Sequence, residues 1–139
     1  MRQNRRGKGN DAPENGLRAS MSSAAFAEGP SGVYAAWEND GQVFFARVGP
    51  DKVTKITPIA PFGTGRERKH PAVAIGKNGD VILVWTEGTG WERGGLPAWQ
   101  VFDKASAETS DFGVQRRGIP VWGLPAVVAE PDGRFSIIH

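Results

Sequence analysis

The chain contains no cysteine, so it can form no disulfide, no thiolate nucleophile and no cysteine-based zinc site. It has only two histidines, His70 and His139, and a multi-histidine metal site is therefore not expected. No apolar run approaches the roughly 18 residues of a membrane-spanning helix, and the N-terminus lacks the apolar segment of a secretory signal. We expect no metal, no cofactor and no membrane partner, and the sequence indicates no compartment.

The excess of positive charge is confined to the N-terminus. Five of the 17 Lys and Arg residues are Arg2, Arg5, Arg6, Lys8 and Arg18. Residues 1–20 are rich in Gly, Asn and Arg, a composition typical of a disordered basic tail. The rest of the chain is almost neutral, so the calculated pI near 9.2 does not make nucleic acid an expected partner.

Turn-forming residues are abundant, with 19 Gly and 10 Pro, and they punctuate a pattern that occurs three times. Residues 71–85 contain Pro-Ala-Val, then a turn, then apolar residues at alternate positions. The pattern returns 54 residues later at 125–139, and in weaker form 48 residues earlier at 23–37. Each copy contains a dipeptide that tolerates positive φ, namely Ser31-Gly32, Asn78-Gly79 or Asp132-Gly133. Each copy therefore predicts a β-hairpin.

The second strand of the hairpin at 71–85 is apolar at every position from Val81 to Trp85, so both of its faces must be covered. Further strands are predicted at 43–48, 53–57 and 98–102 and near Val114. Four antiparallel strands every 48 to 54 residues are typical of propeller blades. We predict an all-β chain in which residues 21–139 form a partial β-propeller of about two and a half four-stranded blades. A β-sandwich is the main alternative, but it would not require the same hairpin three times.

Several segments carry a family resemblance: Lys69-His70-Pro71-Ala72-Val73, Leu83-Val84-Trp85-Thr86-Glu87, Ala98-Trp99-Gln100-Val101-Phe102-Asp103, Leu124-Pro125-Ala126-Val127 and Pro131-Asp132-Gly133. From about residue 20 onward the chain resembles the C-terminal blades of bacterial sialidase-like β-propeller proteins of the BNR, or Asp-box, type. The resemblance implies an exported protein whose fold hosts hydrolases, lectins and scaffolds alike. A closed propeller needs at least four blades, so we expect the remainder of a longer chain or a homo-oligomer to complete the ring.

Two loops are expected to lie together on the ligand face of the propeller, at 64–70 and 87–94. The predicted ligand-binding residues in them are Arg66, Arg68, His70, Glu87, Trp91, Glu92 and Arg93. Guanidinium groups suit a carboxylate or sulfate, and a tryptophan offers a flat apolar surface to a sugar ring, so the set fits an acidic glycan. The alternative interpretation is a solvated charged turn, with Trp91 packed over the neighbouring blade. Asn39, Asp40, Arg116, Arg117, Trp122 and His139 are expected at the same face, Trp122 as a core residue and His139 as the end of a strand.

For sialidase chemistry the family resemblance implies an arginine triad, a tyrosine nucleophile assisted by a glutamate, and an aspartate acid/base. The only tyrosine, Tyr34, lies in the middle of a predicted strand and is interpreted as a packing residue. The Asp-box pattern, Ser-x-Asp-x-Gly-x-Thr-Trp, is absent. We predict a carbohydrate-binding or interaction segment that is not catalytic by itself. The alternatives are an exo-sialidase or other glycoside hydrolase with catalytic residues in missing blades, and a structural scaffold. For ordinary glycoside hydrolysis, Glu87 and Glu92 could form a carboxylate pair on one loop.

Overall fold

The computed structural model describes residues 23–48, 58–63, 67–103 and 108–139. These residues form nine β-strands and no helix. The strands are β1 (Ala24–Gly29), β2 (Gly32–Asn39), β3 (Gln42–Val48), β4 (Lys69–Ile75), β5 (Val81–Glu87), β6 (Leu96–Phe102), β7 (Thr109–Val114), β8 (Ala126–Ala129) and β9 (Phe135–Ile138). The all-β prediction is confirmed for this part of the chain. The predicted tail at 1–20 and the predicted strand at 53–57 lie outside the described residues.

The three predicted hairpins are present, and each turn contains a residue that accepts a positive φ. Gly32, Gly79 and Gly133 have φ values of 119°, 89° and 91° at the turns of the β1–β2, β4–β5 and β8–β9 hairpins. A further hairpin joins β2 to β3 through Asp40 and Gly41, both at positive φ. A type I′ turn requires such a pair of left-handed residues, and Asp-Gly is among its preferred sequences.

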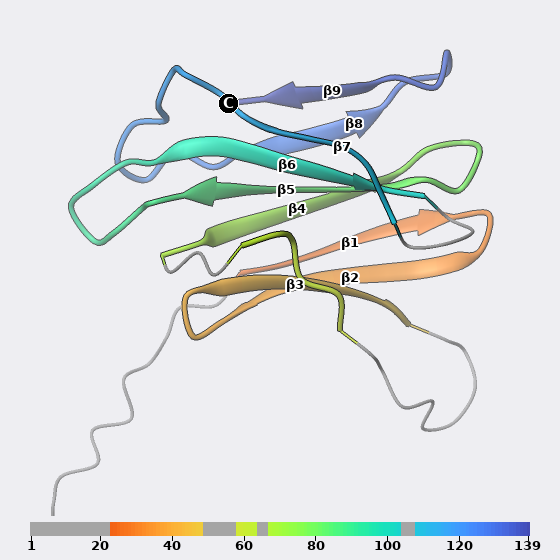
Figure 1. Ribbon diagram of the computed structural model, residues 1–139, viewed down its shortest axis with the longest axis horizontal. Coiled ribbons are helices and arrows are strands. Elements are labelled where there is room, and N and C mark those ends of the chain that lie inside the picture. The colour runs from red at the N-terminus through yellow and green to blue at the C-terminus, as the bar shows by residue number, and fades with distance from the viewer. Residues whose placement is uncertain (1–22, 49–57, 64–66, 104–107) are drawn as a thin grey trace, which may run out of the picture.

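The strands form three antiparallel sheets that lie one above another (Figure 1). The first sheet has the order β1-β2-β3, the middle sheet β4-β5-β6-β7, and the last sheet β8-β9. The strand predicted near Val114 is β7, which pairs with β6. Beside β3, Phe45 and Ile59 exchange two backbone hydrogen bonds of 2.9 and 2.8 Å. Among the described residues, only the middle sheet has the predicted four strands.

Two apolar layers join the sheets. The layer between the first and middle sheets contains Phe45 and Phe102, whose ring centroids lie 4.7 Å apart. Tyr34 packs against this layer with its ring centroid 6.4 Å from that of Phe45, as expected of a packing residue. The layer between the middle and last sheets includes Val84 and Phe135. Each sheet therefore covers one face of its neighbour, and the middle sheet is enclosed between the other two.

Strand β5 is covered on both faces, as its uninterrupted apolar sequence predicts. Leu83 and Trp85 belong to the layer shared with the first sheet, whereas Ile82 and Val84 belong to the layer shared with the last sheet. Both edges of β5 are also paired, to β4 and to β6. Full burial of one aliphatic side chain contributes about 1.5–3 kcal/mol to the free energy of unfolding. The buried side chains of β5 therefore make this strand a main source of the stability of the fold.

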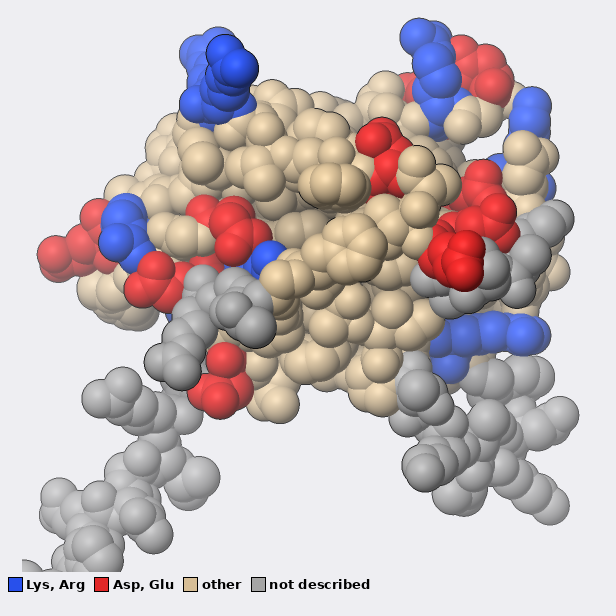
Figure 2. All heavy atoms as spheres, in the orientation of Figure 1, with Lys and Arg blue, Asp and Glu red and all other residues tan. Residues whose placement is uncertain are grey.

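Four connecting segments lie at the end of the sheets that is on the left in Figure 1. They are the turn at 40–41, the residues at 67–68 that precede β4, the loop at 88–95 and the loop at 115–125. Figure 2 shows that charged side chains gather around the ends of the sheets, with uncharged surface between them. The end that carries these four segments is the one where the sequence predicts a ligand site.

Candidate functional site

Backbone hydrogen bonds hold these connecting segments together. The amide of Arg68 donates to the carbonyl of Gly41 at 2.9 Å, which joins the start of β4 to the β2–β3 turn. The amide of Thr89 donates to the carbonyl of Glu67 at 3.1 Å. The two loops that the sequence assigned to one ligand face therefore meet.

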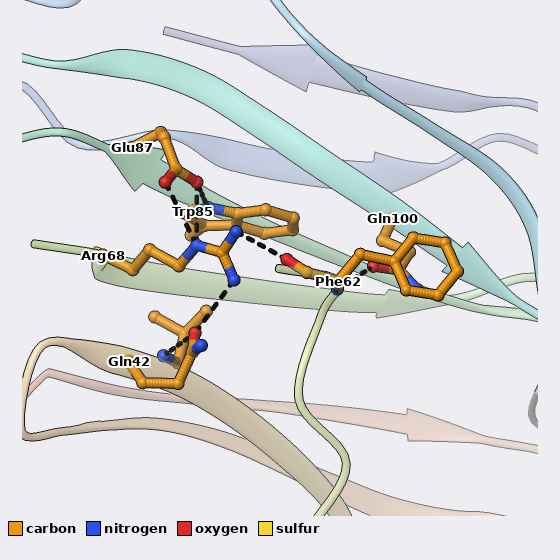
Figure 3. Close-up of polar contacts among 7 residues, drawn as sticks. Gln42, Phe62, Arg68, Trp85, Glu87 and Gln100 are labelled. Carbon is orange, nitrogen blue, oxygen red and sulfur yellow. Dashed lines mark hydrogen bonds and ion pairs between the residues drawn. The ribbon is translucent and has the colours of Figure 1, made fainter. Parts of the chain in front are cut away.

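Arg68 is the centre of a buried polar cluster between the first and middle sheets (Figure 3). Its Nε donates to Glu87 Oε2 at 2.9 Å, its Nη1 to Gln42 Oε1 at 3.3 Å, and its Nη2 to the carbonyl of Phe62 at 2.6 Å. The guanidinium also lies over the ring of Trp85, 5.2 Å from the centroid. All three guanidinium nitrogens thus donate to protein acceptors.

The Glu87 carboxylate is committed to the same cluster. It accepts both from Arg68 and from Trp85 Nε1, the latter at 2.6 Å. Only 8% of the Arg68 side chain and 27% of the Glu87 side chain are exposed. A buried charge is stable only when it is paired and hydrogen-bonded, so these two predicted ligand residues are committed to each other, and Arg68 also reaches the first sheet through Gln42.

The cluster extends into the middle sheet through Gln100, which is almost fully buried. Its Oε1 accepts from the amide of Phe62 at 2.8 Å, and its Nε2 donates to Thr109 Oγ1. The segment around Phe62 is therefore fixed at its amide by Gln100 and at its carbonyl by Arg68. The Phe62 backbone thus links Arg68 at the loop end to Gln100 farther along the middle sheet.

The middle of the loop at 88–95 is a tight turn that presents Trp91 and Glu92 to solvent. Gly90 and Arg93 bridge the base of the turn, with Gly90 N donating to Arg93 O at 3.0 Å. Thr89 Oγ1 also donates to Arg93 O at 3.0 Å. The Trp91 side chain at the tip is 72% exposed, so it does not pack over a neighbouring sheet of this chain.

Trp122, from the loop at 115–125, contacts Trp91 edge to face. The two ring centroids lie 5.1 Å apart at an interplanar angle of 83°. Trp122 is 62% exposed, so the prediction that it belongs to the core is wrong. It occupies the third position of a turn in which Gly123 N donates to Pro120 O at 2.9 Å, with a φ of 69°. This left-handed position, characteristic of a type II turn, belongs to an exposed loop.

Close backbone contact between the two loops brings these tryptophans together. The amide of Ile119 donates to the carbonyl of Gly95 at 2.7 Å. A Cβ atom on Gly94 would lie 2.0 Å from the carbonyl oxygen of Ile119, and one on Gly123 would lie 2.0 Å from Cγ2 of the same residue. Glycine at 94 therefore permits the approach of the loops, whereas glycine at 123 permits close packing within the loop at 115–125.

Arg93 follows Trp91 by two residues in the chain, and its side chain is exposed. Its Nη2 donates to Glu67 Oε2, and 62% of the Arg93 side chain and 55% of the Glu67 side chain are exposed. Exposed ion pairs contribute little to stability, because water and salt screen them. The Arg93 guanidinium, unlike that of Arg68, can therefore exchange its partner for a ligand at small cost.

His70 lies in an irregular part of β4, where the register shifts between Lys69 and Ala72. Its φ is 56°, and its side chain is partly buried. Burial lowers the pKa of His70, the nearby Glu38 opposes this effect, and Lys69 adds to it. Glu38 is itself buried, and its Oε2 has no hydrogen-bond partner among the described residues.

The six predicted ligand residues that the structure describes thus divide into three groups. Arg68 and Glu87 belong to the buried cluster, and His70 lies partly buried in the β4 irregularity. Trp91, Glu92 and Arg93 are exposed on one loop, while Arg66 lies outside the described residues. Sequence reasoning missed the pairing of Trp91 with Trp122. The Pro120-x-x-Gly123 spacing, typical of an exposed turn, was the available signal.

Within the described ranges, no group of three or more His, Asp and Glu side chains is arranged to hold a metal ion. The same residues form no helix that is long and apolar enough to cross a membrane. Comparisons with protein-family models, with curated proteins and with solved structures found no match.

Proposed function

We propose that this chain is a carbohydrate-binding segment of a sialidase-like β-propeller, without catalytic activity of its own. The observation that carries the proposal is the exposed contact between Trp91 and Trp122. Two large aromatic rings from different loops lie in water at the loop end of the sheets. Exposed aromatic side chains at such a position are a feature of binding surfaces.

The geometry of the pair suits a sugar ring. A tryptophan offers a broad apolar face together with one N–H donor, which matches the alternating apolar and hydroxyl surfaces of a pyranose. Because the rings meet edge to face at 83°, they form two walls of an open corner. A sugar placed in this corner contacts one ring by its flat face and the other by its rim.

Arg93 supports an acidic sugar as the ligand class. It lies two residues from Trp91, and among the described residues its exposed guanidinium forms an ion pair with Glu67 alone. A guanidinium binds a carboxylate or sulfate through two parallel hydrogen bonds. The carboxylate of a sialic or uronic acid can replace Glu67 as the acceptor.

The propeller architecture is supported by the order in which the sheets stack. β1, the first strand of the first sheet, packs against β4, and β4 packs against β8. Each of these is the first strand of its sheet, as are the innermost strands of successive propeller blades. We propose that the three sheets are consecutive blades.

The test is titration of the chain with sialylated, uronic-acid and neutral oligosaccharides by calorimetry, using Trp91→Ala, Trp122→Ala and Arg93→Gln variants. We expect each tryptophan variant to bind the acidic oligosaccharide roughly tenfold or more weakly. Arg93→Gln should weaken the acidic ligand and leave a neutral analogue unchanged. The matched control is Phe112→Ala, which removes one ring of another exposed edge-to-face pair, Phe62 with Phe112 at 5.8 Å.

Three results would contradict the proposal. Equal affinities for the wild type and both tryptophan variants would place the ligand elsewhere. Turnover of a fluorogenic sialoside by the purified chain would favour the glycosidase alternative. Absence of glycan binding together with specific association with another protein would favour the scaffold.

A further inference from the structure

The first and last sheets each expose one apolar face. For clarity, the forward face of a sheet is the one directed toward the next sheet in chain order, and the backward face is the opposite one. The backward face of the first sheet includes Phe26 from β1, Val33 and Trp37 from β2, and Phe44 from β3. Phe26 and Val33 are exposed, Phe26 by 70%, whereas Trp37 and Phe44 are half-buried and stack with ring centroids 6.0 Å apart.

The forward face of the last sheet is smaller and also apolar. It consists of Ala126, Val128, Ser136 and Ile138, which share one side according to the strand register. All four are exposed, Ile138 by 57%. None of these residues is charged, and Glu28 is the only charged residue that β1 and β2 place on the backward face of the first sheet. Among the described residues of these two faces, no like charges therefore oppose the contact.

The interior of the chain shows how faces of these two kinds pack. The forward face of the middle sheet, with Ala74, Ile82 and Val84, lies on the backward face of the last sheet, with Val127, Phe135 and Ile137. The forward face of the first sheet, with Ala36 and Phe45, lies likewise on the backward face of the middle sheet, with Leu83. Each internal contact thus packs apolar side chains of one sheet against apolar side chains of the next.

The strand registers show that equivalent residues of the three hairpins lie on the same face of their sheets. Ala36 pairs with Ala25 in the first sheet, Val84 with Ala72 in the middle sheet, and Ile138 with Ala126 in the last sheet. In each pair the first residue comes from the second strand of a hairpin and lies on the forward face. Ile138 therefore occupies in the last sheet the position that Val84 occupies in the middle sheet, where Val84 is fully buried under the last sheet.

We infer that the two exposed faces bind each other between copies of this chain, with the forward face of the last sheet on the backward face of the first sheet of a second copy. The contact repeats the packing of the β4–β5 hairpin on the β8–β9 hairpin, with β8 and β9 of one copy facing β1 and β2 of the other. It joins two different surfaces, so it is heterologous and either closes into a ring or extends. The inference depends on the sheet faces and not on the proposed glycan site.

The decisive experiment blocks one face at a time. Phe26→Arg places a charge on the backward face of the first sheet, and Ile138→Arg does so on the forward face of the last sheet. Both side chains are exposed in one copy, so both variants should retain the wild-type fold, which circular dichroism and thermal melting will verify. Trp91→Arg, at an equally exposed residue of the loop end, is the matched control.

Sedimentation velocity and light scattering over concentrations up to roughly 1 mM will report the assembly state. We expect wild type and Trp91→Arg to associate, and each single-face variant to associate at least about tenfold more weakly. An equimolar mixture of Phe26→Arg and Ile138→Arg should form a one-to-one dimer, because each retains the face that the other lacks. Two copies of either variant alone cannot make this contact.

Three outcomes would overturn the inference. If the wild type is monomeric throughout, the faces are covered by something other than a second copy, such as further sheets of a longer polypeptide. If either variant associates as strongly as the wild type, association does not require the face that this variant blocks. If both variants are monomeric and their mixture is too, the two faces do not bind each other. Loss of glycan binding without loss of association would affect only the proposed function.

Discussion

The guanidinium of Arg68 lies over the indole of Trp85, 5.2 Å from the ring centroid, and both side chains donate to the carboxylate of Glu87. The contact unites a residue that precedes β4 with two residues of β5. Through Gln42 it also reaches the first sheet. A charged segment that looks solvated in the sequence therefore holds two sheets together.

Replacement of Arg68 by methionine should destabilise the fold strongly. The variant leaves the partly buried Glu87 carboxylate without its cation and the carbonyl of Phe62 without its side-chain donor, and loss of one member of a buried pair costs about 3–5 kcal/mol. Urea denaturation followed by circular dichroism measures the change. Arg93→Met removes an arginine from an exposed pair instead, and should change stability by no more than about 1 kcal/mol. Equal effects of the two substitutions would refute a structural role for the buried cluster.

A methyl group on Gly94 should separate the two tryptophans without altering either. The Cβ of Gly94→Ala would lie 2.0 Å from the carbonyl oxygen of Ile119, so the loops at 88–95 and 115–125 must move apart. We expect a loss of stability of about 1–3 kcal/mol, as in other overpacked sites, together with weaker glycan binding. Tryptophan fluorescence and calorimetry measure the two effects.

Gly90→Ala provides the matched control in the same loop. Its Cβ would approach only the end of the Arg93 side chain, at 4.0 Å. Binding should be unchanged in this variant. If Gly94→Ala binds the acidic oligosaccharide as well as the wild type does, the contact between the loops does not position the ligand.

Protonation of His70 should make stability depend on pH. Burial lowers the pKa of His70 in the folded state below its ordinary value of 6.5, so the unfolded chain binds the proton more readily. The stability associated with neutral His70 is complete above pH 6.5 and is lost as the pH falls below that value. Thermal melts between about pH 8 and pH 5 measure the loss.

His70→Asn should flatten this part of the pH profile, because asparagine tolerates the left-handed backbone at this position but does not titrate. His139→Asn, which replaces the other, exposed histidine, should retain the wild-type profile. Identical profiles for His70→Asn and the wild type would show that His70 does not cause the dependence.

The sequence was sufficient to predict the hairpins and the doubly covered strand. Gly-containing turns determine local geometry directly, and five consecutive apolar residues from Val81 to Trp85 can be buried only between two layers. Positions such as Arg68 could not be predicted in the same way. Its environment is created by Gln42, Phe62 and Glu87, which are up to 26 residues away in the chain.

Trp122 illustrates a different reason for failure. Tryptophan is buried on average, so the residue type alone favoured a core position for Trp122. The turn from Pro120 to Gly123 and the left-handed backbone at Trp122 prevail over that preference. The contact between Trp91 and Trp122 depends on how two separate loops pack together, and the sequence alone does not determine that packing.

The enclosure of β5 determines how the chain opens. Its amides lie between two paired strands and beneath two apolar layers, so exchange of their hydrogens with solvent deuterium requires most of the fold to separate. The β8–β9 hairpin has one bare face and can detach while the β5 amides remain protected. We therefore expect melting to proceed from the outermost layers inward, with the amides of Leu83 and Val84 the last to exchange.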